Sequence, residues 1–317
     1  MNHAREKQTV KDFFYKLYLS YIPNKRDNLK QIIIKVFFLV SLITLIVSAG
    51  YLTNYFLSAK KQDNIIDEGR TVWHSASSAT TESGDPAPSP SVNELMLQEN
   101  GDFKGWITIS GTKVDNPIYQ TTDNEFYLTH NQKKQKSVYG ALFFDCNNTI
   151  TEENTDKNLI VYGHHMKNGS MFANLTKYKS LSFYKEHPTI EFSTLYKTST
   201  YKIYAAFVLN ASKSDDNGYI YNISRQSFIN EDDFNSWTAE AFERSLISTG
   251  VDVNIDDNII TLVTCTYDFD DARFIVMARE TREGEDTAVD TSSASANPSP
   301  RYPKRWYDDR KIDYPFD

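Results

Sequence analysis

The hydrophobic residues of this chain begin with one long run near the N-terminus. Residues 36–57, VFFLVSLITLIVSAGYLTNYFL, form 22 consecutive positions without a charged side chain. A helix of that length reaches across the hydrocarbon core of a bilayer, which is about 30 Å thick. The run therefore predicts a single transmembrane helix, and residues 63–73 predict a short helix after it.

The charges around this run predict its orientation. Residues 1–35 carry eight Lys or Arg against three Asp or Glu, and only Lys60 and Lys61 follow the run closely. The positive-inside rule then places a basic N-terminus in the cytoplasm and the remaining chain outside the cell membrane. Residues 47–49, Val-Ser-Ala, resemble a signal-peptidase site, but the apolar run continues past them, so we expect an uncleaved, single-pass anchor.

Short hydrophobic runs, separated by turn signals such as Ser110-Gly111 and Asn217-Gly218, follow over residues 92–282. Many short strands at this spacing favour a mostly β fold, a barrel or a sandwich, over alternating β/α units. Apolar residues near helical spacing over 230–248 predict one long helix, with acidic and capping residues at 230–233. The predicted strands are 105–109, 117–120, 141–144, 159–162, 189–193, 201–209, 259–264 and 274–278.

Composition sets the limits of this domain. The chain of 317 residues is 40% hydrophobic, which is enough for a substantial core over 92–282. Residues 58–91 predict an extracellular helix and a Ser/Pro-rich tether, and residues 283–317 predict a disordered tail or a docking segment. The net charge is −8, and the residues after 35 are more acidic than that total, so a nucleic-acid-binding surface is not expected.

The last two predicted strands bring two chemically useful side chains to one sheet edge. Cys265 ends the first run and Arg273 opens the second, with a short, mostly polar loop between them. A thiol is a nucleophile in its thiolate form, which a guanidinium favours, and the same cation can stabilise an oxyanion. The alternative from this stretch alone is a small buried cysteine beside a surface arginine.

A histidine pair lies at the end of another predicted strand. The run 159–162 stops at Gly163, so His164 leaves a strand end as Cys265 does. Cysteine and histidine suffice for thiol-based acyl transfer, because the imidazole carries the proton that attack and leaving-group departure require. Two adjacent histidines also suggest a metal, but no HExxH or paired CxxC motif supports one, so we predict neither metal nor cofactor. A surface pair without a role is the remaining alternative.

Cys146 is the other cysteine of the chain and follows the predicted strand 141–144. We predict a structural or surface role for it. In an exported chain, a disulfide between Cys146 and Cys265 is the competing hypothesis, and it would mask the nucleophile.

Several segments of the domain together match one family pattern. They are the TLVTC of 261–265, the DDARFIVMA that contains Arg273, the YGHHM of 162–166 with its following MFANL, and the early GWITISGTKVDNPIYQ and FYLTHN. With these motifs, residues 92–282 resemble a class B sortase, a Gram-positive cell-wall cysteine transpeptidase. The Ser/Pro-rich tether and the tail from Glu283 depart from the family pattern.

The resemblance implies an eight-stranded β-barrel with peripheral helices, including one long helix before the last two strands. It implies that Cys265 attacks the Thr carbonyl of a C-terminal sorting signal, of the Asn-Pro-x-Thr type or related, in a secreted protein. An amine of a peptidoglycan stem or cross-bridge would then resolve the thioacyl enzyme. His164 would be the general acid/base, and Arg273 would hold the oxyanion or substrate backbone. No role is implied for His165.

Three other classes are weighed against this interpretation. A papain-like thiol protease shares the nucleophile and the base, but its local signature is absent and Cys265 follows His164 in the chain. An L,D-transpeptidase would place its cysteine in a glycine-flanked motif, which is missing. A non-enzymatic, membrane-tethered binding domain would use Cys265 and His164 as core residues.

Overall fold

The computed structural model describes residues 2–77, 90–212 and 219–316, and its contacts divide the chain into two compact units, Met1–Lys61 and Gln62–Asp317. The first unit contains α1 (Asn2–Tyr21) and the beginning of α2 (Leu29–Ser77). Lys35 of α2 forms an ion pair with Asp27, with 2.7 Å between Nζ and Oδ1. This pair joins α2 to the turn that precedes it.

The predicted membrane segment lies within α2. Among the described residues, one helical stretch, Leu29–Ser75, is long and apolar enough to cross a membrane. Its apolar side chains, such as Phe37, Ile43 and Leu45, are exposed. Exposed apolar surface of this extent is unfavourable in water and favourable in lipid. The helix is therefore consistent with the predicted anchor over 36–57.

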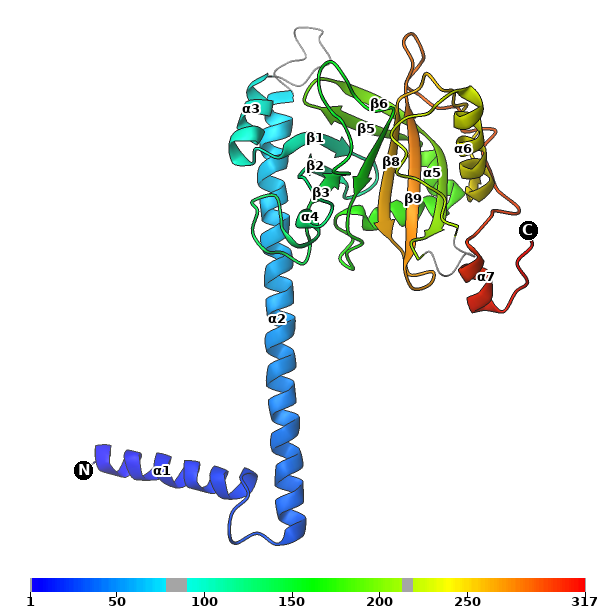
Figure 1. The fold of residues 1–317 in the computed structure, drawn as a ribbon. Coiled ribbons are helices and arrows are strands. Elements are labelled where there is room, and N and C mark those ends of the chain that lie inside the picture. Colours follow the sequence, from blue (N-terminus) through cyan, green and yellow to red (C-terminus); the bar gives the residue numbers. More distant parts are fainter. Residues whose placement is uncertain (1, 78–89, 213–218, 317) are drawn as a thin grey trace. The chain divides into compact units, whose positions relative to one another are not determined.

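The second unit is built around a closed β-barrel, which confirms the predicted mostly β, eight-stranded architecture (Figure 1). The strand order is β1-β2-β3-β4-β8-β9-β6-β5, in which β2/β3 and β4/β8 pair in parallel and the other neighbours are antiparallel. The strands are β1 (Phe103–Thr108), β2 (Asp115–Tyr119), β3 (Leu142–Phe144), β4 (Asn158–Tyr162), β5 (Thr189–Thr194), β6 (Thr198–Asn210), β8 (Ile259–Cys265) and β9 (Ala272–Glu280).

Two hydrophobic clusters cover the two faces of the central strands. All eight barrel strands contribute side chains, such as Val161 and Leu262, to the cluster inside the barrel. Alternate residues of four of these strands, β4, β6, β8 and β9, pack outside the barrel against α6 (Glu231–Arg244); Ile160 and Val263 are examples. Strands buried on both faces have continuous rather than alternating hydrophobic sequences, which explains the unbroken apolar run before Cys265.

The predicted long helix is confirmed as α6, although it ends earlier than expected. The Asn230 side chain caps its N-terminus by accepting a hydrogen bond from the Asp233 backbone N–H. The chain becomes extended at Ser245, and Ile247–Ser248 form β7, which pairs with β10 (Ser295–Ala296). The prediction extended to residue 248 because the apolar residues continue at helical spacing, and the partner strand is distant in sequence.

Smaller helices surround the barrel. They are α3 (Pro90–Glu99), α4 (Phe126–Thr129), the 3-10 helix η1 (Phe172–Lys179), α5 (Leu181–Glu186) and α7 (Lys304–Arg310). The predicted tether over 74–91 is partly corrected, because α2 extends to Ser77 and α3 begins at Pro90; residues 78–89 of that prediction lie outside the described part of the chain. Trp73 stacks on Trp106 of β1, with 5.0 Å between ring centroids, so the end of α2 is held by aromatic packing.

The predicted disorder of residues 283–317 is also corrected, and the docking alternative agrees with the structure. β10 pairs with β7, and Ala294 and Tyr307 are buried. The Asn297 side-chain amide donates to the Ser245 carbonyl at 2.7 Å, and Arg301 pairs with Glu243 of α6. These anchors are isolated along the sequence, so the segment shows no periodic hydrophobic pattern even though it packs on the domain.

A buried ion network fixes the start of this segment. The Arg279 side chain is only 2% exposed and donates from both Nη atoms to Glu285, at 2.7 and 2.8 Å. Lys202 of β6 donates to the same carboxylate at 2.7 Å. The hydrogen bond from Arg279, followed by that from Lys202, holds the pKa of Glu285 well below its ordinary value even though burial opposes this shift.

We expect Glu285→Gln to lower the free energy of unfolding at pH 7 by about 1–3 kcal/mol, because it removes the negative charge that faces the buried Arg279 guanidinium and Lys202, although Asp252 still pairs with Arg279. The pKa of Glu285 is lower in the folded protein than in the unfolded chain, where it is about 4.3, so the ionised carboxylate stabilises the folded state above that pH. This stabilisation is lost as the pH falls and the carboxylate is protonated. The gap between wild type and variant in urea unfolding should therefore narrow below about pH 4. Glu283→Gln, at an exposed position, is the matched control. An equal loss in both variants would contradict the ion-network explanation.

Candidate active site

The pairing of β4, β8 and β9 brings the predicted site residues to one edge of the barrel. β4 and β8 run in parallel with Tyr162 opposite Val263, and the Gly163 N–H continues this ladder to the Val263 carbonyl at 3.0 Å. His164 and Cys265 each lie two residues beyond that pair. On the other side of β8, Cys265 is directly opposite Arg273 in the antiparallel pairing with β9.

The two-residue period of the strands also places Cys265 and Arg273 on the same face. Val263 of β8 and Ile275 of β9 belong to the cluster outside the barrel, beneath α6. Cys265 and Arg273 are each two residues from these positions, so their side chains lie on that outer face, where both are half-buried. Cys265 and Arg273 are therefore cross-strand neighbours on one face, and both are within reach of solvent.

Glycine is required next to His164 because no space exists for a side chain. A Cβ added at Gly163 would lie 2.4 Å from Cδ2 of Leu142 and 2.6 Å from Cδ2 of Phe172, and both neighbours are buried in the core. Gly140 has a positive φ of 60°, and a Cβ there would lie 2.3 Å from the Tyr127 carbonyl. These close approaches position the chain that carries His164.

The two histidines have different partners. The Nε2 of His164 lies 2.7 Å from the Leu128 carbonyl, which can only accept, so Nε2 carries the proton and Nδ1 is the nitrogen left for proton exchange. The Nδ1 of His165 lies 2.8 Å from the Cys265 carbonyl and is the donor in that contact. The His165 ring also packs against Tyr267, with 5.0 Å between centroids. His165 therefore holds the backbone of Cys265, a role that sequence reasoning missed.

The loop between Cys265 and Arg273 is supported by polar contacts. Thr266 donates from Oγ1 to Asp268 at 2.6 Å, and Lys179 of η1 forms an ion pair with the same carboxylate. Burial acts to raise the pKa of Asp268, but the hydrogen bonds from Lys179 and Thr266, together with the charges of Lys179 and Arg310, outweigh it and lower the pKa. Arg273 donates from Nη1 to the Ala272 carbonyl at 3.1 Å.

The C-terminal segment reaches this loop. Tyr302 and Trp306 stack on each other with 4.2 Å between centroids, and both pack against the cluster inside the barrel, to which Phe269 of the loop belongs. Arg310 lies over the Trp306 ring, 4.1 Å from its centroid. The charge pairs Lys304–Asp308 and Arg305–Asp309, each four residues apart within α7, are the sequence signal that could have indicated a short helix here.

Cys146 lies outside this arrangement. It follows β3, and its backbone N–H donates to the Asn124 side chain at 2.7 Å. Cys146 and Cys265 are both free, so the competing disulfide hypothesis is not supported by the structure. Among the described residues, no group of three or more His, Cys, Asp or Glu side chains is placed to hold a metal ion.

A half-buried cysteine opposite an arginine, with a histidine just beyond the end of the parallel neighbouring strand, is suited to acyl transfer. The comparisons with known proteins agree. A Sortase domain model matches residues 107–281. Sortase B of Listeria monocytogenes is 34% identical over 224 residues, which cover 69% of this chain and 85% of the relative. The chain therefore belongs to the sortase family and is a sortase B-like cysteine transpeptidase.

Two solved structures show the same fold. A Staphylococcus aureus sortase B–substrate complex is 27% identical, with a TM-score of 0.62, over 71% of this chain and 99% of that one. A sortase B complexed with triglycine is 26% identical, with a TM-score of 0.61, over 71% of this chain and 99% of that one. The matched family domain ends at residue 281, before β10 and α7.

We expect Gly163→Ala to lower the free energy of unfolding by about 1–3 kcal/mol, because the new methyl group overlaps buried Leu142 and Phe172. It should also lower kcat, since the chain that carries His164 must shift. Gly101→Ala is the control, because a Cβ at Gly101 meets no atom within 4 Å. Thermal melting and steady-state transpeptidation of both variants test this, and a Gly163→Ala protein with wild-type stability and turnover would contradict it.

Proposed function

We propose that this transpeptidase attaches secreted proteins to the cell wall. Cys265 attacks the Thr carbonyl of a C-terminal sorting signal, of the Asn-Pro-x-Thr type or related, and a peptidoglycan amine accepts the acyl group. The observation that carries this proposal is the meeting of Cys265, Arg273 and the His164 strand end at one barrel edge. The substrate and triglycine complexes of the related sortase B structures support the two substrate classes.

The residues divide the chemistry between them. The Cys265 thiol gives its proton to His164, the resulting thiolate forms a bond to the Thr carbonyl carbon, and Arg273 stabilises the negative charge that develops on the carbonyl oxygen. The C–N bond then breaks as His164 donates a proton to the leaving amine, which gives a thioester. In the second half, the acceptor amine attacks, His164 removes its proton, and the C–S bond breaks to release the thiolate.

His165 has a positioning role in this proposal. Its Nδ1–H holds the Cys265 carbonyl, which restricts the strand end that presents the sulfur. The contact is to the backbone, so His165 does not exchange a proton with substrate. This role accounts for the presence of His165 next to His164, and the proposed reaction then needs only one general base.

Removing each member of the group should have a different effect. Cys265→Ala deletes the nucleophile and should reduce activity to background. His164→Ala removes the proton carrier and should lower kcat by roughly two to four orders of magnitude. Arg273→Lys keeps the charge but loses the planar, forked donors, so it should remain severely impaired. His165→Ala should cost much less than His164→Ala.

A labelled sorting peptide and an added amine measure these effects, on variants first shown to melt like wild type. Cys146→Ser is the matched control and should keep near wild-type turnover. A collapse in His165→Ala with near-normal His164→Ala would reverse the assignment of the base. Release of the trapped thioacyl peptide by water but not by amine would instead favour a thiol protease, and no trapped adduct at all would favour a binding domain.

We further propose that residues 36–57 anchor the protein in the cell membrane, with the N-terminus in the cytoplasm and the catalytic domain outside. The basic residues before the apolar run motivate this orientation. In intact cells, an externally added protease should cleave the domain and leave residues 1–35 protected. N-terminal sequencing of membrane-extracted protein that began at Gly50 would show a cleaved signal peptide instead.

A further inference from the structure

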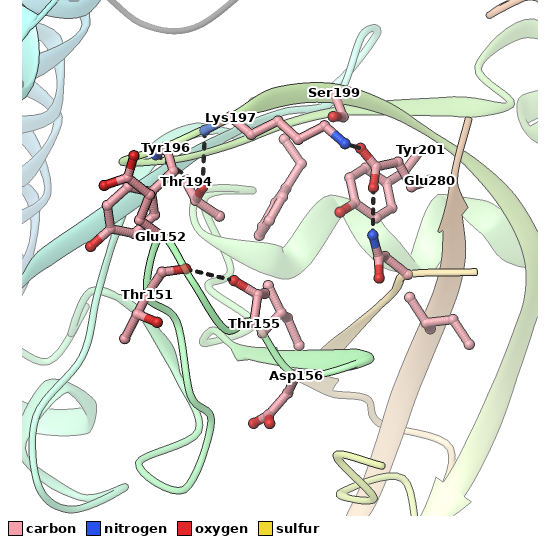
Figure 2. Close-up of a pocket in the computed structure, with 14 residues that line it drawn as sticks. Thr151, Glu152, Thr155, Asp156, Thr194, Tyr196, Lys197, Ser199, Tyr201 and Glu280 are labelled. Atoms are coloured by element: carbon pink, nitrogen blue, oxygen red, sulfur yellow. Dashed lines mark hydrogen bonds and ion pairs between the residues drawn. The ribbon is translucent and has the colours of Figure 1, made fainter. Parts of the chain in front are cut away.

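A second, polar pocket lies at the end of the barrel away from Cys265. It has a volume of about 160 Å³, and it is lined by the turn between β5 and β6, the connection from β3 to β4, the start of β8 and the end of β9 (Figure 2). Glu280 is the last residue of β9, whereas Arg273 lies near its beginning. At about 3.3 Å per residue, the two ends are roughly 20–25 Å apart.

A buried carboxylate forms part of this pocket. The Glu280 side chain is 9% exposed and accepts hydrogen bonds from Asn258 Nδ2 at 2.8 Å and from Lys197 Nζ at 2.6 Å (Figure 2). Burial acts to raise the pKa of Glu280, but hydrogen bonds from Asn258, Lys197 and Ser199 outweigh it and lower the pKa. The pocket therefore holds a negative charge at neutral pH.

The cation that compensates this charge is replaceable. Lys197 comes from the β5–β6 turn, and its side chain is 64% exposed although its ammonium reaches the buried Glu280. An ion pair with so exposed a partner contributes little to stability, because the lysine regains solvation and side-chain freedom when it leaves. Lys197 thus shows that a four-carbon chain ending in an ammonium fits here, and it can leave without uncovering the core.

The remaining lining favours another cation over an anion. Glu152 and Asp156 also line the pocket, so its lining contains three acidic residues and one lysine. Asp156 accepts from the Thr149 N–H, whereas Glu152 is exposed at the rim. The aromatic rings of Phe192 and Tyr201 supply apolar contact area for an alkyl chain. A concave surface with this charge raises the local concentration of cations.

We propose that this pocket binds an alkylammonium group of a ligand, which displaces Lys197 and pairs with Glu280. The ligand class is a primary amine on a flexible chain, either a lysine-like side chain of a peptide or a free diamine. The inference does not depend on the proposed sorting reaction, because it uses none of the residues around Cys265. Lys197 acts as a tethered competitor, which lowers the apparent affinity of the ligand.

Calorimetric titration of the detergent-solubilised full chain tests this proposal. The probe is Nα-acetyl-lysine amide, and its Nε-acetylated analogue, which is uncharged, should not bind. Lys197→Met removes the competitor and should tighten probe binding about threefold to tenfold. Glu152→Gln should weaken it about twofold to threefold. Lys185→Met, at an exposed position outside the pocket, is the matched control and should change nothing.

The tightening in Lys197→Met cannot result from misfolding, which makes this variant more decisive than Glu280→Gln. A parallel titration with 1,5-diaminopentane distinguishes the two ligand types. A diamine affinity equal to that of Nα-acetyl-lysine amide indicates a free diamine as the ligand, and a weaker diamine affinity indicates a lysine-like side chain of a peptide. Equal binding of the uncharged analogue, or an affinity unchanged by both Lys197→Met and Glu152→Gln, would overturn the proposal. Transpeptidation measured on the same variants should remain at the wild-type level, so failure here is distinguishable from failure of the sorting reaction.

Discussion

The parallel pairing of β4 with β8 is the constraint on which the active site depends. Parallel neighbours end at the same sheet edge, so the residues that follow them emerge side by side. His164 and Cys265, about a hundred residues apart in sequence, meet for this reason. The pairing is itself held by hydrophobic packing on both faces, inside the barrel and beneath α6. A loss of core packing under β8 would therefore affect catalysis as well as stability.

Three sets of contacts, each farther from Cys265 than the last, support the site. His165 holds the carbonyl of Cys265, Lys179 and Thr266 hold Asp268 in the following loop, and the C-terminal segment packs behind that loop through Tyr302. Few of these contacts touch a reacting atom. They restrict the loop that separates Cys265 from Arg273, and such restriction is what preorganised catalysis requires.

The local elements could be predicted from the sequence, whereas their supports could not. The eight barrel strands and the start of α6 carry strong hydrophobic and capping signals, so sequence and structure agree there. β7 and β10 have two residues each, and each is a strand only because it pairs with the other, which is distant in sequence. The C-terminal segment packs on the domain through isolated aromatic residues. Adjacent His164 and His165 look alike in sequence. Their different partners, the Leu128 and Cys265 carbonyls, come only from the tertiary fold.

The barrel also separates two sets of charges. Arg273 lies opposite Cys265 in the pairing of β8 with β9, and Glu280, Glu152 and Lys197 line the pocket at the other end of β9. The separation of roughly 20 Å exceeds the Debye length of about 8 Å at physiological ionic strength. The two sets of charges are therefore largely screened from one another. An anionic pocket and the Cys265 end of the barrel can therefore lie in one small domain without strong electrostatic interference.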